Sequence, residues 1–385
     1  MNKLFLRDLI LSNPFLKRFY IKYRAKAKQS DLIPINKLDE VLNKAEKVIL
    51  NEGVNVNGIR IGLVKASTTY VGFVKERDYY PKYERFLKNN NIAYDFYDPY
   101  NHDWISQAKK FDLIIWHTNS DPSTQMLAEG KIYTLEKLLN INTYPSFNEV
   151  WGYENKINAH YQYQSFALPE IPTFISHSKH DAIEYVKTCK FPLISKIATG
   201  SSSFGVDKIK TKAEALALIN KVFSYRGKKT YFQYLAQKDY VYFQEFIESA
   251  EYDLRVICIG DKLLGYYRYP NKGDFRASGA GNYEKKEIPF EALELSYQAR
   301  EAFGSTCLAT DMVYCKERKQ FLIIESSIFI GIDTCEQLVI NGEAGVYERN
   351  KEYDFSFRKG KFWPQELALK ALLEKNLKLP LPICD

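Results

Sequence analysis

Residues 190–206, KFPLISKIATGSSSFGV, combine a fixed cation with a loop of small residues. Lys196 ends a short apolar strand, and a glycine and serine run with almost no side-chain bulk follows it. The run includes Gly200, Ser201, Ser202, Ser203 and Gly205. A cation on a strand, with backbone N–H groups that close over oxygens, is a way to bind a polyphosphate. The pattern predicts a phosphate-binding loop, and the loop alone leaves an ordinary hairpin turn as the alternative.

Two carboxylates further along the chain each end an apolar strand. Asp311 lies in LATDMVY and Glu325 in LIIESS, which would hold both at one edge of a sheet. Two unpaired buried carboxylates repel each other, and one of them takes up a proton unless a cation is present. Hard oxygen ligands suit divalent cations, so the pair predicts a metal site.

Three arginines are spaced along the expected hairpin strands, namely Arg255, Arg268 and Arg276. The planar fork of arginine suits phosphoryl oxygens and a carboxylate together. Gly279 and Gly281 follow Arg276 and indicate a mobile loop over a substrate. The alternative for each arginine is a solvated charge on a strand.

The composition is that of a soluble globular protein with two or three domains. The chain has 385 residues, of which 45% are hydrophobic and 26% charged, and no apolar run approaches the about 20 residues that span a bilayer. Its six cysteines form no CxxC pair, so we expect a reducing compartment, the cytoplasm, and no structural zinc.

The net charge of +7 belongs to the first 30 residues, which hold eight basic residues and one acidic residue. The remaining chain is neutral, so we expect no nucleic-acid partner. Phe15, Phe19 and Tyr23 share one face of a predicted helix, with cations away from it. This arm is not a signal peptide. It is expected to dock on its own protein or on a second subunit, as in a homodimer, with an anionic inner membrane surface as the alternative.

The segment 58–150 alternates strands and helices, which indicates a small α/β layer with a parallel sheet. Strands are predicted at 59–64, 92–98 and 111–117, and helices at 79–91 and 131–140. A helix at 38–52 precedes the layer, in a basic helical extension over 1–57.

From 151 to 345 the pattern changes to hairpin strands beside helices, which is typical of an α+β domain. Strands are predicted at 191–198, 239–247, 252–270 and 320–328, and helices at 155–168, 211–223 and 290–303. A tail over 346–385 ends in a helix at 363–376 that is expected to pack back on the body.

Four features occur in a fixed order: strand lysines, the glycine loop, QEFI followed by YDLR, and the Asp311–Glu325 pair. Together they resemble the ATP-grasp superfamily, most closely its glutathione-synthetase and ribosomal-protein-S6-modification (RimK-like) ligase branch. The resemblance covers about residues 58–335. It implies an α/β and α+β chain in which the α/β layer precedes two α+β subdomains that clamp ATP.

The resemblance also implies roles in nucleotide binding. Lys156 and Lys196 would reach the phosphates, and Ser201–Gly205 would close over them. The backbone of Phe246 and Ile247 would pair with the adenine edge. Gln244 or Glu245 would bind the exocyclic amine of the adenine, and Asp253 would bind the ribose.

The remaining roles concern charge and metal. Arg276 would face the acyl phosphate, with Arg255 and Arg268 as γ-phosphate contacts. Asp311 and Glu325 would hold Mg²⁺, or Mn²⁺ as an alternative. The family has Glu, any residue, then Asn, whereas this chain has Ser327 in place of the asparagine. A serine hydroxyl reaches less far, so a second metal would be weaker.

The implied activity is ATP-dependent ligation of a carboxylate to an amine through an acyl phosphate, with release of ADP and phosphate. The sequence does not identify the substrates, which are small molecules or a glycan: the basic arm suggests a cell-envelope glycan intermediate that gains an amino acid or amide, and a soluble amino acid, peptide or protein terminus is the alternative. A kinase, and a regulatory or scaffold module that binds ATP without turnover, are the alternatives.

Overall fold

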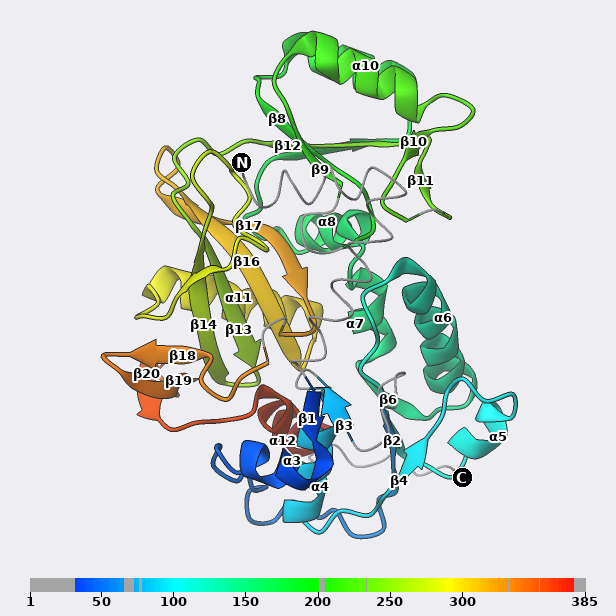
Figure 1. The fold of residues 1–385 in the computed structure, drawn as a ribbon, viewed down its shortest axis with the longest axis vertical. Helices are drawn as coiled ribbons and strands as arrows, with labels where there is room; N and C mark the ends of the chain where they lie inside the picture. Colours follow the sequence, from blue (N-terminus) through cyan, green and yellow to red (C-terminus); the bar gives the residue numbers. More distant parts are fainter. Residues whose placement is uncertain are drawn as a thin grey trace.

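The computed structural model describes residues 32–65, 73–75, 78–200, 205–232, 234–330, 333–352 and 354–376. Three sheets follow one another along the long axis of the molecule (Figure 1). A parallel α/β layer lies at one end, a large antiparallel sheet in the middle and a small antiparallel sheet at the other end. This mixture of α/β and α+β parts confirms the fold class predicted from the sequence. The arm over residues 1–30 lies outside the described residues.

The α/β layer is a four-stranded parallel sheet in the order β4-β2-β5-β6. Its strands are β2 (Ile61–Val64), β4 (Tyr94–Tyr97), β5 (Leu113–Ile115) and β6 (Asn142–Tyr144). Strands β2 and β5 are entirely buried and apolar, as expected for parallel strands covered on both faces. The helical segments between them are α4 (Tyr80–Asn89), α5 (Trp104–Ala108), α6 (Pro122–Tyr133) and the π-helix η2 (Thr134–Leu138).

Two helices of this part differ from their predicted bounds. The helix predicted at 131–140 begins at Pro122, because the Asp121 side chain accepts from the Thr124 N–H and proline suits the first helical turn. The helix predicted at 38–52 is wrong beyond Leu42, where α3 (Ile35–Leu42) ends. Arg85 of α4 and Asn90, which caps α4, bind the backbone that follows α3: Arg85 Nη2 donates to the Ala45 carbonyl at 2.8 Å, and Asn90 Nδ2 to the Val48 carbonyl at 3.0 Å. These tertiary bonds replace helical ones.

The central sheet is antiparallel in the order β17-β16-β13-β14-β19-β18, with β15 paired to β14 and β20 to β19. Its strands are β13 (Asp253–Ile259), β14 (Lys262–Tyr269), β15 (Asn282–Glu284), β16 (Cys307–Cys315), β17 (Gln320–Ser327), β18 (Leu338–Ile340), β19 (Glu343–Arg349) and β20 (Phe355–Lys359). The helix α11 (Phe290–Phe303) packs against it, at the bounds that the sequence predicts. This sheet and the α/β layer share one hydrophobic core.

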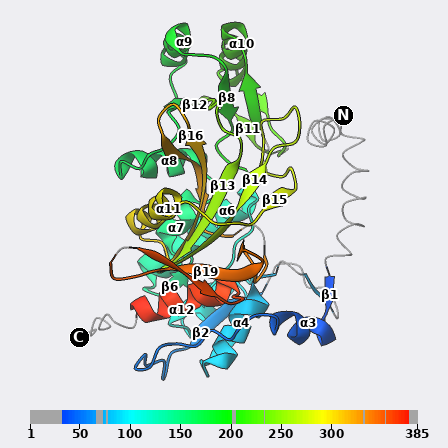
Figure 2. The same cartoon turned by 90° about the vertical axis from the view of Figure 1, so that its left-hand side faces the viewer.

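The small sheet has the order β7-β12-β8-β9 and a core of its own. Its strands are β7 (Thr173–Ser176), β8 (Leu193–Lys196), β9 (Val206–Ile209) and β12 (Val241–Glu245). Helices α9 (Lys179–Thr188) and α10 (Lys212–Val222) cover one face, as Figure 2 shows. Leu193, Ile209 and Phe243 pack on these helices. The residues that alternate with them therefore point away from the helices, toward the central sheet.

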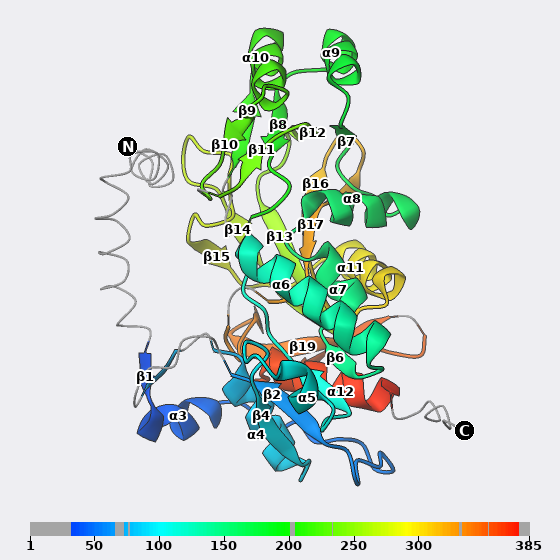
Figure 3. The same ribbon diagram turned by 90° about the vertical axis from the view of Figure 1, so that its right-hand side faces the viewer.

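Short elements connect these bodies. They are β1 (Leu32–Pro34), which pairs with β3 (Phe73–Lys75), α7 (Phe147–Gly152), α8 (Lys156–Ser165), and the ribbon of β10 (Lys228–Lys229) and β11 (Ala236–Gln237). Figure 3 shows α7 and α8 along the side of the molecule, between the α/β layer and the small sheet.

The end of the described chain packs back on the body. The last helix, α12 (Pro364–Asn376), lies against α4, and Glu366 Oε1 accepts from Arg85 Nη1 at 2.5 Å. The sequence places a domain boundary between residues 345 and 346, and strand β19 runs through it. The division of the chain into segments 1–57, 58–150, 151–345 and 346–385 stays a proposal. Within the described ranges, no helix has the length and apolar character that crossing a membrane requires.

Candidate functional site

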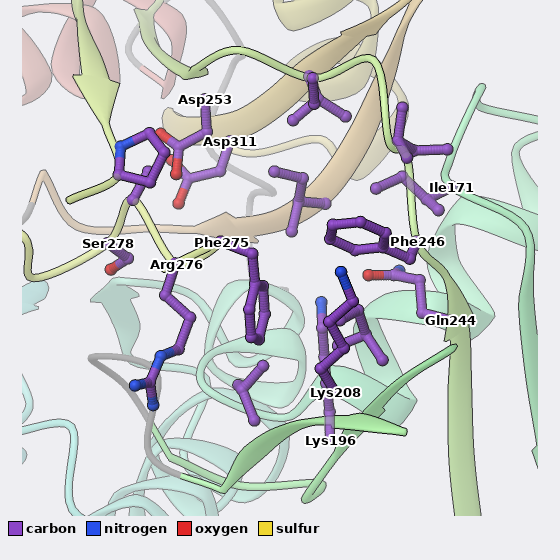
Figure 4. A pocket seen from close by; sticks show the side chains of 18 of the residues that line it. Ile171, Lys196, Lys208, Gln244, Phe246, Asp253, Phe275, Arg276, Ser278 and Asp311 are labelled. Carbon is purple, nitrogen blue, oxygen red and sulfur yellow. The ribbon is translucent and has the colours of Figure 1, made fainter. Parts of the chain in front are cut away.

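A cavity of about 810 Å³ lies between the small sheet and the central sheet. Figure 4 shows Lys196 and Lys208 reaching into it from one side, with Asp253 and Asp311 on the facing side. Residues that the sequence singled out make up much of its wall: Lys156, Lys196, Gly200, Gln244, Glu245, Phe246, Ile247, Asp253, Arg268, Arg276, Asp311 and Glu325. Segments far apart in the chain thus meet at one cavity.

Lys196 ends β8 on the face of the small sheet that points into the cavity. Its side chain is buried, with 4% exposure, and it forms no ion pair or hydrogen bond with any residue that the structure describes. Burial lowers the pKa of Lys196 to about 8, although Glu325 opposes that shift. Its ammonium lies 5.7 Å from the centre of the Tyr242 ring. A buried ammonium without a hydrogen bond or an ion pair is costly, so this geometry calls for an anionic ligand.

Lys156 begins α8 and lies beside the start of the glycine loop. Its ammonium donates to the Gly200 carbonyl, and its backbone N–H donates to the Ala198 carbonyl at 2.8 Å. At the other end of the loop, Gly205 has φ +69°, and a Cβ there would lie 2.6 Å from the Ile197 side chain. Glycine is therefore required at that position. The predicted phosphate-loop residues Ser201, Ser202 and Ser203 lie outside the described ranges.

Two further lysines that the sequence reasoning missed also line the cavity. Val206, Lys208 and Lys210 alternate along and just beyond β9 on its cavity face. The Lys208 ammonium lies 3.4 Å from the centre of the Phe246 ring, a cation–π contact. The sequence signal for these lysines is the alternation in VDKIK. It identifies them only once it is known which face of β9 points into the cavity.

The end of β12 forms the part of the cavity assigned to adenine. Phe246 and Ile247 follow the last ladder pair of β12, so their backbone groups lie outside the ladder. Gln244 Nε2 donates to Thr173 Oγ1 at 3.0 Å, and Glu245 accepts from Arg318 Nη2 at 2.7 Å. Apolar side chains surround this region, namely Ile171, Ile194, Val313 and Ile324. The result is an apolar slot with polar groups at its rim, which suits a flat heterocycle.

Register places four charged groups of the central sheet in one network. Asp253 is opposite Arg268, and Arg255 is opposite Asp311. Arg255 donates through Nε and Nη2 to the two Asp311 oxygens at 2.6 and 2.7 Å. Arg268 Nη2 lies 2.6 Å from Asp311 Oδ2, and its Nε donates to Asp253. Cross-strand pairing therefore neutralises these side chains locally.

The network sets the protonation of both acids. Burial favours the neutral form of Asp311, but Arg255 and Arg268 outweigh it and lower the pKa of Asp311 to about 2. Burial raises the pKa of Asp253 to about 6, although Arg268 opposes the rise. Asp253 is thus bound to an arginine rather than extended toward a ligand, and Arg255 is not among the residues that line the cavity.

Glu325 faces the cavity beside Asp311. A β-bulge between Asp311 and Met312 sets Ile324 and Glu325 of β17 against Asp311, and both side chains line the cavity. Among the described residues Glu325 has no hydrogen-bond or ion-pair partner. Ser327 differs, because its hydroxyl accepts from the Phe329 N–H at 3.2 Å and it is not part of the cavity wall. This placement gives the metal role expected for Ser327 no support.

The fit of a divalent cation follows from these contacts. Over the described ranges, no group of three or more Asp, Glu, His or Cys side chains is arranged to hold a metal. Mg²⁺ is commonly bound by one or two carboxylates together with phosphates and waters. Glu325 is free, and Asp311 Oδ1, which accepts one bond, has a lone pair left. Glu325 and Asp311 therefore fit Mg²⁺ only when phosphate oxygens complete the shell.

Arg276 lies on the loop after β14 and lines the cavity (Figure 4). Its Nε and Nη2 each lie 3.2 Å from an Asp274 oxygen. Both residues come from the same loop, so movement of the loop carries the pair together.

Glu154 is a carboxylate near this site that sequence reasoning missed. It precedes the α8 cap Asn155 in a left-handed conformation, with φ 54°. Burial raises the pKa of Glu154 to about 7, Lys156 opposes the rise, and Glu325 adds to it. Glu154 is partly exposed, and it is not among the residues that line the cavity. Only the backbone geometry before α8 identifies it.

Comparison with known proteins agrees with this geometry. A model of the RimK-like ATP-grasp domain matches residues 155–344. The α-aminoadipate–LysW ligase LysX of Saccharolobus solfataricus is 32% identical over 169 residues, 43% of this chain and 58% of that protein. LysX of Sulfurisphaera tokodaii is 23% identical over 228 residues, 58% of this chain and 75% of that protein. The chain thus spans little more than half the length of the first of these relatives.

Two solved structures share the fold. D-cycloserine synthetase DcsG has a TM-score of 0.53 at 12% identity, over 82% of this chain and 99% of that one. N5-carboxyaminoimidazole synthase from Aspergillus clavatus, in complex with ADP and 5-aminoimidazole ribonucleotide, has a TM-score of 0.50 at 14% identity, over 85% of this chain and 79% of that one. The sequence prediction of the family is confirmed: residues 155–344 of this chain form an ATP-grasp domain of the RimK-like branch.

Proposed function

We propose that the protein is an ATP-dependent carboxylate–amine ligase. The charge inventory of the cavity is the observation that supports this most. Four lysines line it without an ion-pair partner among the described residues, against one unpaired carboxylate, Glu325. The four are Lys156, Lys196, Lys208 and Lys210. A concentrated positive field around one free carboxylate suits a polyphosphate that brings a divalent cation.

In this proposal the adenine occupies the slot around Phe246 and Ile247, and the phosphates extend toward Lys196 and Lys156. Gln244 and the end of β12 supply polar contacts to the base. Gly205 keeps the loop backbone close enough to cover phosphate oxygens. Asp253 forms an ion pair with Arg268. Its role in this proposal is therefore to orient Arg268 at the ribose side of the cavity, and not to bind the ribose directly.

The reaction proceeds in two displacements. A substrate carboxylate oxygen attacks the γ-phosphorus, the bond to the β-γ bridging oxygen breaks, and ADP leaves with that electron pair. The amine then attacks the carbonyl carbon of the acyl phosphate, phosphate departs with the C–O electron pair, and the amine loses a proton. Arg276 stabilises the charge that develops on the acyl phosphate, with Arg255 and Arg268 behind it. The protein contributes mainly position and electrostatics.

Glu325 and Asp311 would hold Mg²⁺, or Mn²⁺ in its place, and the ion would neutralise charge on the phosphates. Two arginines hold Asp311 in position. The structure offers no support for Ser327 as the ligand of a second ion.

The relatives' names point to amino-acid chemistry for the substrates. One is named for ligating α-aminoadipate to LysW, and DcsG for synthesising D-cycloserine. We therefore propose amino-acid or peptide carboxylates and amines in the cytoplasm, where ATP is supplied. A cell-envelope glycan acceptor, a homodimer and a membrane contact through residues 1–30 stay predictions that depend on the arm.

Product analysis tests the proposal. With MgATP and a panel of amino acids, a ligase releases both ADP and free phosphate only when a carboxylate and an amine are present together. Hydroxylamine should trap the acyl phosphate as a hydroxamate. ADP without free phosphate, together with a phosphorylated hydroxyl, would identify a kinase and contradict the ligase.

The contact of Ser327 favours a second candidate, a module that binds ATP without turnover. Because Ser327 is not among the residues that line the cavity and its hydroxyl accepts from the Phe329 N–H, the cavity lacks the third metal ligand that the family pattern predicts. Calorimetric binding of MgATP with no product across the panel would support the module, whereas any hydroxamate would exclude it.

A further inference from the structure

The loop between β14 and β15, residues 270–281, forms a large part of the cavity wall but contains no helix or strand. Residues 270 and 273–278 all line the cavity. Two glycines of the loop, Gly273 and Gly281, have φ of +80° and +85°, and a Cβ on either would meet nothing within 4 Å. Glycine thus serves the backbone turn there and not close packing. Such a loop needs an anchor if it is to hold Arg276 in one place.

The hydrogen bonds of Arg276 to Asp274 give the tip of the loop a local shape. The Arg276 N–H donates to Asp274 Oδ1 at 3.0 Å, in addition to the two side-chain contacts with the same carboxylate. The Asp274 N–H in turn donates to the Asn271 carbonyl at 2.9 Å. The partners of these bonds all lie in the loop, so the bonds do not fix its position relative to the two sheets.

The side chain of Phe275 makes contacts outside the loop. Figure 4 shows its ring in the cavity, between Arg276 and Lys208. The ring packs edge-on against Phe246, with 5.9 Å between centroids and 87° between the planes. The Lys208 ammonium lies 3.4 Å from the centre of the Phe246 ring and 6.0 Å from the centre of the Phe275 ring. Edge-on ring pairs and cations over rings are both favourable contacts.

These three side chains, Phe275, Phe246 and Lys208, form a cluster that we call the aromatic clasp. Its members come from different parts of the fold: Lys208 from β9 of the small sheet, Phe246 from the end of β12, and Phe275 from the loop after β14 of the central sheet. The aromatic clasp therefore joins the loop to the opposite wall of the cavity.

We propose that the aromatic clasp positions Arg276 for catalysis by holding residues 270–281 against the small sheet, an inference that rests on the ligase function proposed above. Arg276 directly follows Phe275 in the chain, so a ring that is anchored across the cavity limits where the guanidinium can lie. Phe275 is in this sense a positioning residue that acts through Arg276. Lys208 contributes a contact to the clasp in addition to its charge.

Limited digestion with trypsin reports on the loop directly, because trypsin cleaves after lysine and arginine and the loop contains Lys272 and Arg276. In Phe275→Ala, cleavage at these two sites of the native protein should be about fivefold faster, since the lost ring contacts raise the population of the open loop. Phe275→Leu should act in the same direction, and Phe275→Tyr, which keeps the ring, should stay close to wild type.

The matched control is Phe290→Ala. Phe290 also belongs to an edge-on ring pair, with 5.6 Å between its centroid and that of Phe355, but it is exposed and lies outside the cavity wall. This substitution should leave both cleavage in residues 270–281 and the reaction rate unchanged.

Kinetics separate positioning from direct binding. In Phe275→Ala, kcat for hydroxamate formation should fall about tenfold, because catalysis is sensitive to small displacements of a charged group. The dissociation constant of MgATP and the KM of the acid should stay close to wild type, and Phe275→Tyr should recover the rate. A weaker MgATP affinity with unchanged kcat would make Phe275 a nucleotide contact and overturn the inference.

Equal cleavage of wild type and Phe275→Ala within the loop would show that the ring does not anchor it, which also overturns the inference. If the wild-type protein forms no hydroxamate with any acid, the ligase function itself fails. The trypsin comparison does not depend on turnover, so it still decides whether the aromatic clasp holds the loop.

Discussion

Lys196 is the side chain on which nucleotide binding should depend most. It is buried, it forms no hydrogen bond or ion pair with the described residues, and it lines the cavity together with Glu325. Burial disfavours the ammonium more than Glu325, Asp311 and Glu170 favour it, so phosphate oxygens of a ligand should supply much of its stabilisation.

Replacing Lys196 with methionine should therefore weaken MgATP binding by about tenfold or more, since a charge-assisted contact contributes about 1.5–3 kcal/mol. Isothermal calorimetry gives the dissociation constant directly. Lys221→Met, on the helix α10 and away from the cavity, is the control. An affinity equal to that of the wild type would remove Lys196 from the site.

The lowered pKa of Lys196 makes a second prediction. Only the protonated amine attracts phosphate, so MgATP affinity should fall as the pH rises through about 8. Glu325, Asp311 and Glu170 favour the charged form, and Lys156 disfavours it. Lys196→Arg stays charged over this range and should flatten the dependence. A wild-type affinity that is constant from pH 7 to 9, measured by calorimetry, contradicts this reading.

At the residue scale, local signals carried the sequence reasoning. Lys196 and Gly205 stand within one short stretch, so their types and order could be recognised directly. To identify Lys208, one must know which face of β9 points into the cavity. To identify Glu154, one must know that its backbone is left-handed, which its residue type does not indicate. Neither property is local, and both were missed.

At the scale of elements, strand register decides the chemistry of the central sheet. Arg255, Arg268, Asp253 and Asp311 come from three strands, and pairing sets them on one face. The sequence indicated the strands but not their partners, so it could not show that the arginines and acids bind one another. These contacts make the network part of the fold as well as of the site.

Removing one arginine should accordingly destabilise the protein. Arg268→Met leaves Asp253 buried without a cation, which should cost about 3–5 kcal/mol of the free energy of unfolding. Chemical denaturation measures this cost. Arg358→Met, at an exposed pair with Glu348, should change stability by less than about 1 kcal/mol. Equal effects of the two substitutions would mean that the buried network stabilises the protein no more than an exposed ion pair does.

Elements with strong patterns were predictable, and those set by distant contacts were not. The bounds of α11 follow from a well-patterned segment that proline and glycine flank. Residues 43–52 also have a helical pattern, but Arg85 of α4 and its cap Asn90 bind their backbone carbonyls. Strands β19 and β20 have little pattern of their own: β19 pairs with the edge of β14, and β20 pairs with β19.

At the scale of the whole molecule, the two largest hydrophobic cores of the described residues belong to different bodies. The α/β layer and the central sheet share one of them, and the small sheet forms the other with α9 and α10, while a smaller cluster around Ile171 and Ile247 joins the small sheet to the central sheet. The residues that line the cavity come from both bodies. Cations on the small sheet and acids on the central sheet thus belong to opposite walls, and a ligand that binds both draws the walls together.

The most direct test is a crystal structure with a non-hydrolysable ATP analogue and Mg²⁺. The account predicts a triphosphate whose oxygens contact Lys156 and Lys196 on one wall, while Glu325 reaches the ion on the other. The base should lie beside Phe246 and Ile247. A nucleotide bound outside this cavity, or one whose phosphates lie away from both Lys196 and Glu325, would contradict the account.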